Sequence, residues 1–162
     1  LIVISDEIHC DLVLPGYKHT PYATLSQAAA DHCIVFHAAS KTFNLAGLQV
    51  SNSWIPGGET RSRFQSELSR TGFMGLNAFG LTAAQAAYAG GGAWLEAVKT
   101  YLRGNLDYLR AFLAERLPML RLVEPEGTYF AWIDCSALGL DAAALDELVT
   151  YRARLWLDGG SI

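Results

Sequence analysis

The sequence is poor in cysteine, and no long apolar run occurs in it. Its 162 residues include three cysteines, Cys10, Cys33 and Cys135, an odd number without a C-x-x-C spacing. This argues against a disulfide framework and favours buried free thiols in a reducing compartment such as the cytoplasm. No uninterrupted apolar run approaches the ~18 residues that a membrane helix needs, so we expect no membrane partner.

Positive charge is also scarce. Lysine and arginine number 12 against 16 aspartates and glutamates, for a formal net charge of −4. An acidic balance argues against nucleic acid or an anionic membrane surface as a partner. Hydrophobic residues make up 51% of the chain, which is enough for one sizeable core.

The first third of the chain predicts a β-rich α/β sheet. Leu1–Ser5 and Cys33–His37 are apolar and rich in β-branched residues, as buried parallel strands are. Gln49–Ile55 alternates like a third strand. Between these strands, Leu25–Asp31 fits a short helix, and Ser40–Leu48 is predicted to be a loop or turn ending near Gly47.

The remainder of the chain predicts mostly helices. Apolar residues recur at helical spacing from Trp94 to Leu113 and indicate one long amphipathic helix. Further helices are expected at Glu59–Ser69, Ala78–Ala89 and Ala142–Leu157, the last with Asp141 as N-cap, and a strand pair at Leu120–Val123 and Thr128–Asp134. Gly90-Gly91-Gly92 breaks the pattern, so we expect residues 1–90 to belong to one domain and residues 91–162 to a second, α+β domain.

Two polar segments follow the two predicted buried strands. Ser5–His9 comes after the first strand and Ala39–Asn44 after the second. The carboxyl ends of parallel strands form the edge at which α/β sheets bind ligands. A lysine and a carboxylate at one edge suit pyridoxal 5'-phosphate (PLP), because the lysine forms an imine with the cofactor aldehyde and the carboxylate keeps the ring nitrogen protonated.

These segments resemble those of a known family. VISDEIHCDLVLPGYKHTPYATLS and ASKTFNLAGLQVS resemble fold-type-I PLP-dependent aminotransferases of class I/II, and most of all the bacterial cystathionine β-lyase and C–S lyase branch. The resemblance continues through NAFGLTAAQAAYAGGGAWLEAVKTYLRGN and GTYFAWIDC, and so covers nearly the whole chain. It implies part of a large PLP-binding α/β domain followed by a small α+β domain, a homodimer, and an amino-acid substrate.

The resemblance also implies roles for individual residues. Lys41 matches the lysine that carries the cofactor, Asp6 the partner of the pyridine nitrogen, and Ser40 a serine that contacts the phosphate. His9 stands where many transaminases have a tyrosine near the cofactor's phenolic oxygen, and the lyase branch is similar in having histidine. Gln49 stands eight residues after the lysine, where many aminotransferases have a phosphate-binding arginine. His9 and Gln49 therefore favour the lyase branch.

The implied reaction is β-elimination from a sulfur amino acid, which gives a thiol, pyruvate and ammonia. An aminotransferase of the same fold and a PLP-fold sensor domain of a transcription regulator remain alternatives, and the substrate side chain is not indicated. Leu1–Ile4 begins directly with strand-type residues, so we expect the chain to be a piece of a longer protein. We also expect the piece to be inactive alone, because the arginine that binds the substrate carboxylate in this family has no match here.

Other classes share single features with the sequence. Asp6-Glu7-Ile8-His9 after an apolar strand imitates the magnesium motif of helicase-type NTPases, but no G-x-x-x-x-G-K-[ST] loop is present. A zinc site would have to combine residues without ordinary ligand spacing, namely His9, Cys10, His32, Cys33 and His37. Structural alternatives also remain: His9 could be a core histidine, and Tyr129 and Trp132 are predicted to lie in the core of the second domain.

Overall fold

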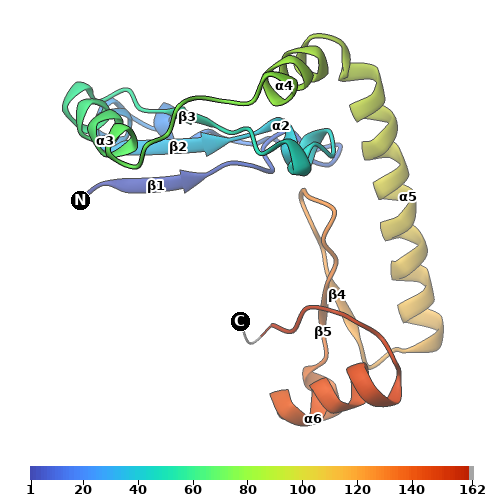
Figure 1. Ribbon diagram of the computed structural model, residues 1–162. Helices are drawn as coiled ribbons and strands as arrows, with labels where there is room; N and C mark the ends of the chain where they lie inside the picture. The colour runs from blue at the N-terminus through green and yellow to red at the C-terminus, as the bar shows by residue number, and fades with distance from the viewer. Residues whose placement is uncertain (161–162) are drawn as a thin grey trace. The chain divides into compact units, whose positions relative to one another are not determined.

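A mixed β-sheet organises the N-terminal part of the protein. The computed structural model describes residues 1–160, and within them this sheet has the order β1-β2-β3. The strands are β1 (Val3–Asp6), β2 (Cys33–His37) and β3 (Asn52–Trp54). β1 and β2 are parallel, as expected (Figure 1), and Asp6 is in register with Phe36. The last residues of β1 and β2 therefore lie at the same edge of the sheet. The expectation that the first strand is buried is wrong for the described residues, because β1 lies at the edge of this sheet and Ile4 is 69% exposed.

Short helices and loops surround this sheet. They are η1 (Tyr22–Thr24), α1 (Gln27–Asp31), α2 (Ala39–Thr42), η2 (Ala46–Leu48), α3 (Gly58–Arg70) and α4 (Ala78–Gly90). On one side of β2 the buried Cys33 and Val35 pack with Ala23 of η1. On the other side the ring of Phe36 lies 6.3 Å from that of Phe64 on α3. Alternate residues of β2 thus face opposite layers, as the pleat of a strand requires.

The described chain divides into two compact units. The first comprises residues 1–104 together with 125–129, and the second comprises residues 105–124 and those from 130 onward. The helix α5 (Gly92–Arg116) begins in the first unit and continues into the second. The domain boundary that the sequence predicts at Gly90–Gly92 concerns the full-length protein and stays a prediction.

The second unit contains a small antiparallel sheet. Its strands are β4 (Arg121–Val123) and β5 (Trp132–Asp134), followed by η3 (Ser136–Leu138), α6 (Ala142–Asp146) and the π-helical η4 (Glu147–Arg152). Asp141 caps α6, since its side chain accepts a hydrogen bond from the amide of Ala144 at 2.9 Å, as predicted. Arg110 of α5 bonds both oxygens of Glu124.

Two further sequence expectations about elements are wrong, and one holds. Ser40–Leu48, expected to be a loop or turn, contains the short helical turns α2 and η2, so this expectation holds; the next two do not. The strand expected from Thr128 is confined to β5, because Thr128 has a φ of 66°, which a strand does not allow. The last helix ends at Arg152 rather than Leu157.

The predicted core positions of two aromatic residues are also wrong. Tyr129 is 42% exposed and Trp132 is 60% exposed. Tyr129 lies outside the strands, and Trp132 is the first residue of β5, paired with Val123 at the end of a two-stranded sheet that leaves its side chain exposed. Within residues 1–160 no helix has the length and apolar character required to cross a membrane.

Candidate functional site

Asp6 ends β1 and lies at the carboxyl edge of the sheet. Its side chain is exposed, and Oδ1 accepts a hydrogen bond from the amide of Ile8 at 3.1 Å. This bond is an Asx turn, in which a short carboxylate replaces a backbone acceptor and bends the chain away from the strand. The turn leaves the rest of the Asp6 carboxylate available to a ligand at the edge.

Glu7, the next residue, is only 8% exposed, whereas Asp6 is exposed. Its carboxylate accepts hydrogen bonds from the Ser5 hydroxyl at 3.0 Å and the Tyr22 amide at 2.9 Å. The other oxygen lies 2.8 Å from Nε2 of His19. Burial alone would raise the pKa of Glu7, but the bonds from His19, Tyr22 and Ser5 outweigh it and lower the pKa below its ordinary value.

His9 lies in the turn after β1, half-buried against the hairpin tip. Its ring meets that of Tyr129 edge-on, with the ring centroids 5.4 Å apart. Burial lowers the pKa of His9, the positive charge of Lys41 lowers it further, and the negative charge of Asp6 acts in the opposite direction. The imidazole therefore lies within electrostatic reach of both predicted site residues, which come from separate segments of the sequence.

Ser40 and Lys41 lie in the helical turn α2, directly after β2. Lys41 is exposed, whereas the neighbouring Thr42 is almost completely buried. Oγ1 of Thr42 donates a hydrogen bond to Oδ2 of Asp11 at 3.0 Å. This bond ties the turn that carries Lys41 to the segment that follows Asp6.

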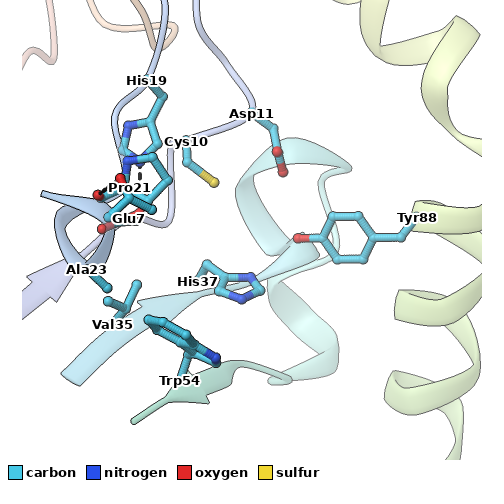
Figure 2. Close-up of a pocket in the computed structure, with 11 residues that line it drawn as sticks. Glu7, Cys10, Asp11, His19, Pro21, Ala23, Val35, His37, Trp54 and Tyr88 are labelled. Atoms are coloured by element: carbon cyan, nitrogen blue, oxygen red, sulfur yellow. Dashed lines mark hydrogen bonds and ion pairs between the residues drawn. The ribbon is translucent and has the colours of Figure 1, made fainter. Parts of the chain in front are cut away.

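Two cavities border this region within the first unit. One, of about 380 Å³, lies between the segment after β1, β2 and α4, and Figure 2 shows Tyr88 reaching toward His37 across it. The thiol of Cys10 lines the same cavity, and burial together with the charge of Asp11 raises its pKa to about 11, so this thiol is a poor nucleophile at neutral pH. The other cavity, of about 280 Å³, has Asp6, His9 and Thr128 in its wall.

The structure thus brings three of the four predicted site residues, Asp6, His9 and Lys41, into one electrostatic neighbourhood, with Ser40 beside Lys41 in α2. Sequence reasoning missed Glu7, Asp11 and His19, which organise this edge. Glu7 is adjacent to Asp6 in the sequence, but the sequence does not show which of the two carboxylates is buried. Among residues 1–160 no three His, Cys, Asp or Glu side chains gather where they could hold a metal ion.

Comparison with known proteins defines the class to which this site belongs. The model of the family described as aminotransferase class I and II matches residues 1–158. The chain belongs to this family, and both the fold and the family predicted from the sequence are confirmed.

Several of the similar proteins are named as lyases. The chain is 45% identical to cystathionine beta-lyase PatB of Bacillus subtilis, over 98% of the chain and 41% of that protein. Among solved structures it is similar to cystalysin from Treponema denticola, which contains pyridoxal 5'-phosphate, with a TM-score of 0.93 and 35% identity over 98% of the chain and 40% of cystalysin. It is also similar to the PLP-bound C–S lyase from Staphylococcus hominis, with a TM-score of 0.83 and 34% identity over 99% of the chain and 40% of that protein. The chain thus spans about two fifths of the length of these relatives.

Proposed function

We propose that the full-length protein containing this chain is a PLP-dependent C–S β-lyase. Its substrate is a sulfur amino acid such as cystathionine, and its products are a thiol, pyruvate and ammonia. The observation that carries the proposal is the placement of Asp6 at the end of β1 and of Lys41 in the turn directly after the parallel strand β2, at the same edge of the sheet. The charges of both residues act on the pKa of His9, which follows β1. The 45% identity to a protein named cystathionine beta-lyase supports the same reaction.

The residues at this edge fit the cofactor chemically. Lys41 offers an exposed primary amine for covalent attachment of the cofactor aldehyde. Asp6 offers an exposed carboxylate, the group that a protonated pyridine nitrogen requires. The hydroxyl of Ser40, one residue before the lysine, is a donor for phosphate. His9 stands beside both charges and would contact the ring substituents.

The roles of the residues in the reaction follow from their chemistry. When bound, PLP supplies an electron-withdrawing ring that disperses the electron pair left on the substrate Cα after its proton departs. Lys41 would hold the cofactor through Nζ, and the same amine would be placed to take the Cα proton of the substrate. The carboxylate of Asp6 would keep a positive charge at the ring nitrogen, which would strengthen that withdrawal. Loss of the thiolate from Cβ and uptake of one water would then account for the thiol, pyruvate and ammonia.

The test is a product assay on the full-length protein. Incubation with cystathionine and PLP should release pyruvate, ammonia and a thiol in equal amounts, and the variant Lys41→Ala should release none. Transfer of amino groups from amino acids to 2-oxo acids, without pyruvate from cystathionine, would overturn the lyase assignment in favour of an aminotransferase.

We further propose a homodimer in the cytoplasm. Large apolar side chains are exposed between α3 and the middle of α4, with Met74 97% and Phe79 83% accessible. An exposed apolar patch of this kind is typical of a protein–protein interface. The three cysteines, Cys10, Cys33 and Cys135, are free thiols, as a reducing compartment favours. Sedimentation of the full-length protein should give twice the monomer mass.

A further inference from the structure

The orientation of Lys41 depends on a helical turn that has little stability of its own. α2 contains four residues, Ala39–Thr42, and no side chain caps its N-terminus. A single turn of helix is unstable in isolation, because nucleation costs more than its few hydrogen bonds return. Contacts with the rest of the first unit must therefore hold α2 in place.

A hydrogen bond between Thr42 and Asp11 holds α2 against the segment that follows β1. Thr42 is 1% exposed, and its hydroxyl donates to Asp11 at 3.0 Å. Backbone hydrogen bonds hold the segment on either side of Asp11: the amide of Cys10 donates to the carbonyl of Glu7 at 3.0 Å, and the amide of Leu12 donates to the carbonyl of His9 at 2.9 Å. Successive helical residues are rotated by about 100°, which is why Thr42 can be buried while Lys41 faces solvent.

The positions of Lys41 and Asp6 are therefore coupled through the bond between Thr42 and Asp11. Asp11 lies five residues after Asp6 on the segment that leaves β1, and Thr42 directly follows Lys41. A shift of α2 relative to that segment would change the distance from Nζ to the place where Asp6 holds its ligand. Misplacement of a reacting group by about 1 Å can lower a rate about 100-fold.

We infer that Asp11, acting through the hydroxyl of Thr42, is a positioning residue that orients Lys41 for proton transfer at the substrate. This inference rests on the proposed function, since it assigns a role within the same site. Neither Asp11 nor Thr42 touches the reacting atoms. Their effect is on the geometry of the lysine, so it falls on the rate of the chemical step rather than on substrate binding.

The test compares variants of the full-length protein that differ in one hydroxyl. Thr42→Val removes the donor and keeps the shape, while Thr42→Ser keeps the donor. Thr100→Val, at an exposed threonine of α5, is the matched control. Four quantities are measured. They are kcat and KM for cystathionine, the pH midpoint at which the absorption band of the bound cofactor changes, and the rate at which acetic anhydride modifies Lys41 in the cofactor-free protein, located by peptide mapping.

We expect Thr42→Val to lower kcat by about 10- to 100-fold with KM changed less than about 2-fold. It should also shift the absorption midpoint and the modification rate of Lys41, and Thr42→Ser should restore most of each. The double variant Asp11→Ala/Thr42→Val should be no worse than Asp11→Ala alone, because both remove one interaction.

Two results with the active protein would overturn the inference, and a third applies if the protein is inactive. In the first, Thr42→Val matches the wild type in kcat, in KM, in the absorption midpoint and in the modification rate of Lys41. In the second, Thr42→Ser is as impaired as Thr42→Val, which would show that packing rather than the hydrogen bond matters. If the wild type neither binds PLP nor releases thiol, the proposed function fails instead. The modification rate of Lys41 then decides the positioning role by itself, and equal rates in Thr42→Val and wild type would reject it.

Discussion

The carboxylate of Glu7 lies 2.8 Å from Nε2 of His19, twelve residues further along the chain. Together with the amide of Tyr22, this contact folds the segment after β1 back onto the strand end. The same carboxylate accepts the Ser5 hydroxyl from within β1. Glu7 therefore helps to fix the backbone on which Asp6 is presented, and its own buried carboxylate is occupied by these three bonds.

Replacing Glu7 by glutamine should destabilise the protein. The amide keeps the size of the side chain but loses the charge that holds its three donors, and breaking a buried hydrogen bond to a charged group costs about 1–3 kcal/mol. Urea unfolding of Glu7→Gln should show this loss. Glu115→Gln, at an exposed glutamate of α5, should change the free energy of unfolding by less than about 0.5 kcal/mol. Equal stability of the two variants would contradict the network described here.

The contribution of Glu7 should depend on pH with a defined sign. Its pKa is lowered in the folded protein from an ordinary value of 4.5. The stabilisation is therefore complete above pH 4.5 and is lost as the pH falls through the lower, folded value. The difference in unfolding free energy between wild type and Glu7→Gln should shrink as the pH is reduced from 7 to 3. A difference that grew over this range would show that the pKa of Glu7 is raised instead.

His9 should report on its two charged neighbours. Burial and the charge of Lys41 lower its pKa below 6.5, while Asp6 raises it. In the cofactor-free protein, Lys41→Met should therefore raise the pKa of His9, and Asp6→Asn should lower it. NMR titration of protein with labelled histidine measures both shifts. An unchanged His9 pKa in Lys41→Met would contradict an electrostatic interaction between Lys41 and His9.

Asp6→Asn should nearly abolish turnover while preserving the fold. The amide has the shape of the carboxylate but not the charge, and loss of a preorganised charge typically lowers kcat by about 100-fold or more. The steady-state rate with cystathionine measures this loss in the full-length protein. The exposed Glu115→Gln again serves as the control for removal of a surface charge. Turnover of Asp6→Asn close to that of wild type would remove Asp6 from the site.

The sequence predicted the strands of the sheet better than the turns between them. Cys33–His37 was predicted with the bounds that β2 has, because a run of apolar residues bounded by polar ones is a strong local signal. The helical form of α2 within the predicted loop or turn was not specified, because a helical turn of four residues has no periodicity to detect and is held by the remote Asp11. The strand start predicted at Thr128 is wrong, since its φ of 66° lies outside the strand region and its amide donates to the carbonyl of Leu12, a remote residue.

The candidate site shows the same division. Lys41 and Asp6 could be proposed from the sequence, because each directly follows a recognisable strand and parallel strands share an edge. The side chains that support them could not, since Glu7, Asp11 and His19 act through contacts between residues 12 to 31 positions apart. Such contacts depend on how the loops fold back onto the strands. No periodic pattern of apolar residues in the sequence indicates that folding.

The attachment of the cofactor to Lys41 is the central claim, and one chemical measurement tests it most directly. The full-length protein is incubated with PLP, reduced with borohydride, digested and mapped by mass spectrometry. The account predicts a phosphopyridoxyl label on the peptide containing Lys41 and its absence in Lys41→Ala. The other lysines are Lys18, which is exposed, and Lys99, which is paired with Glu96 at 2.9 Å. A label on Lys18 or Lys99 with none on Lys41 would contradict the account.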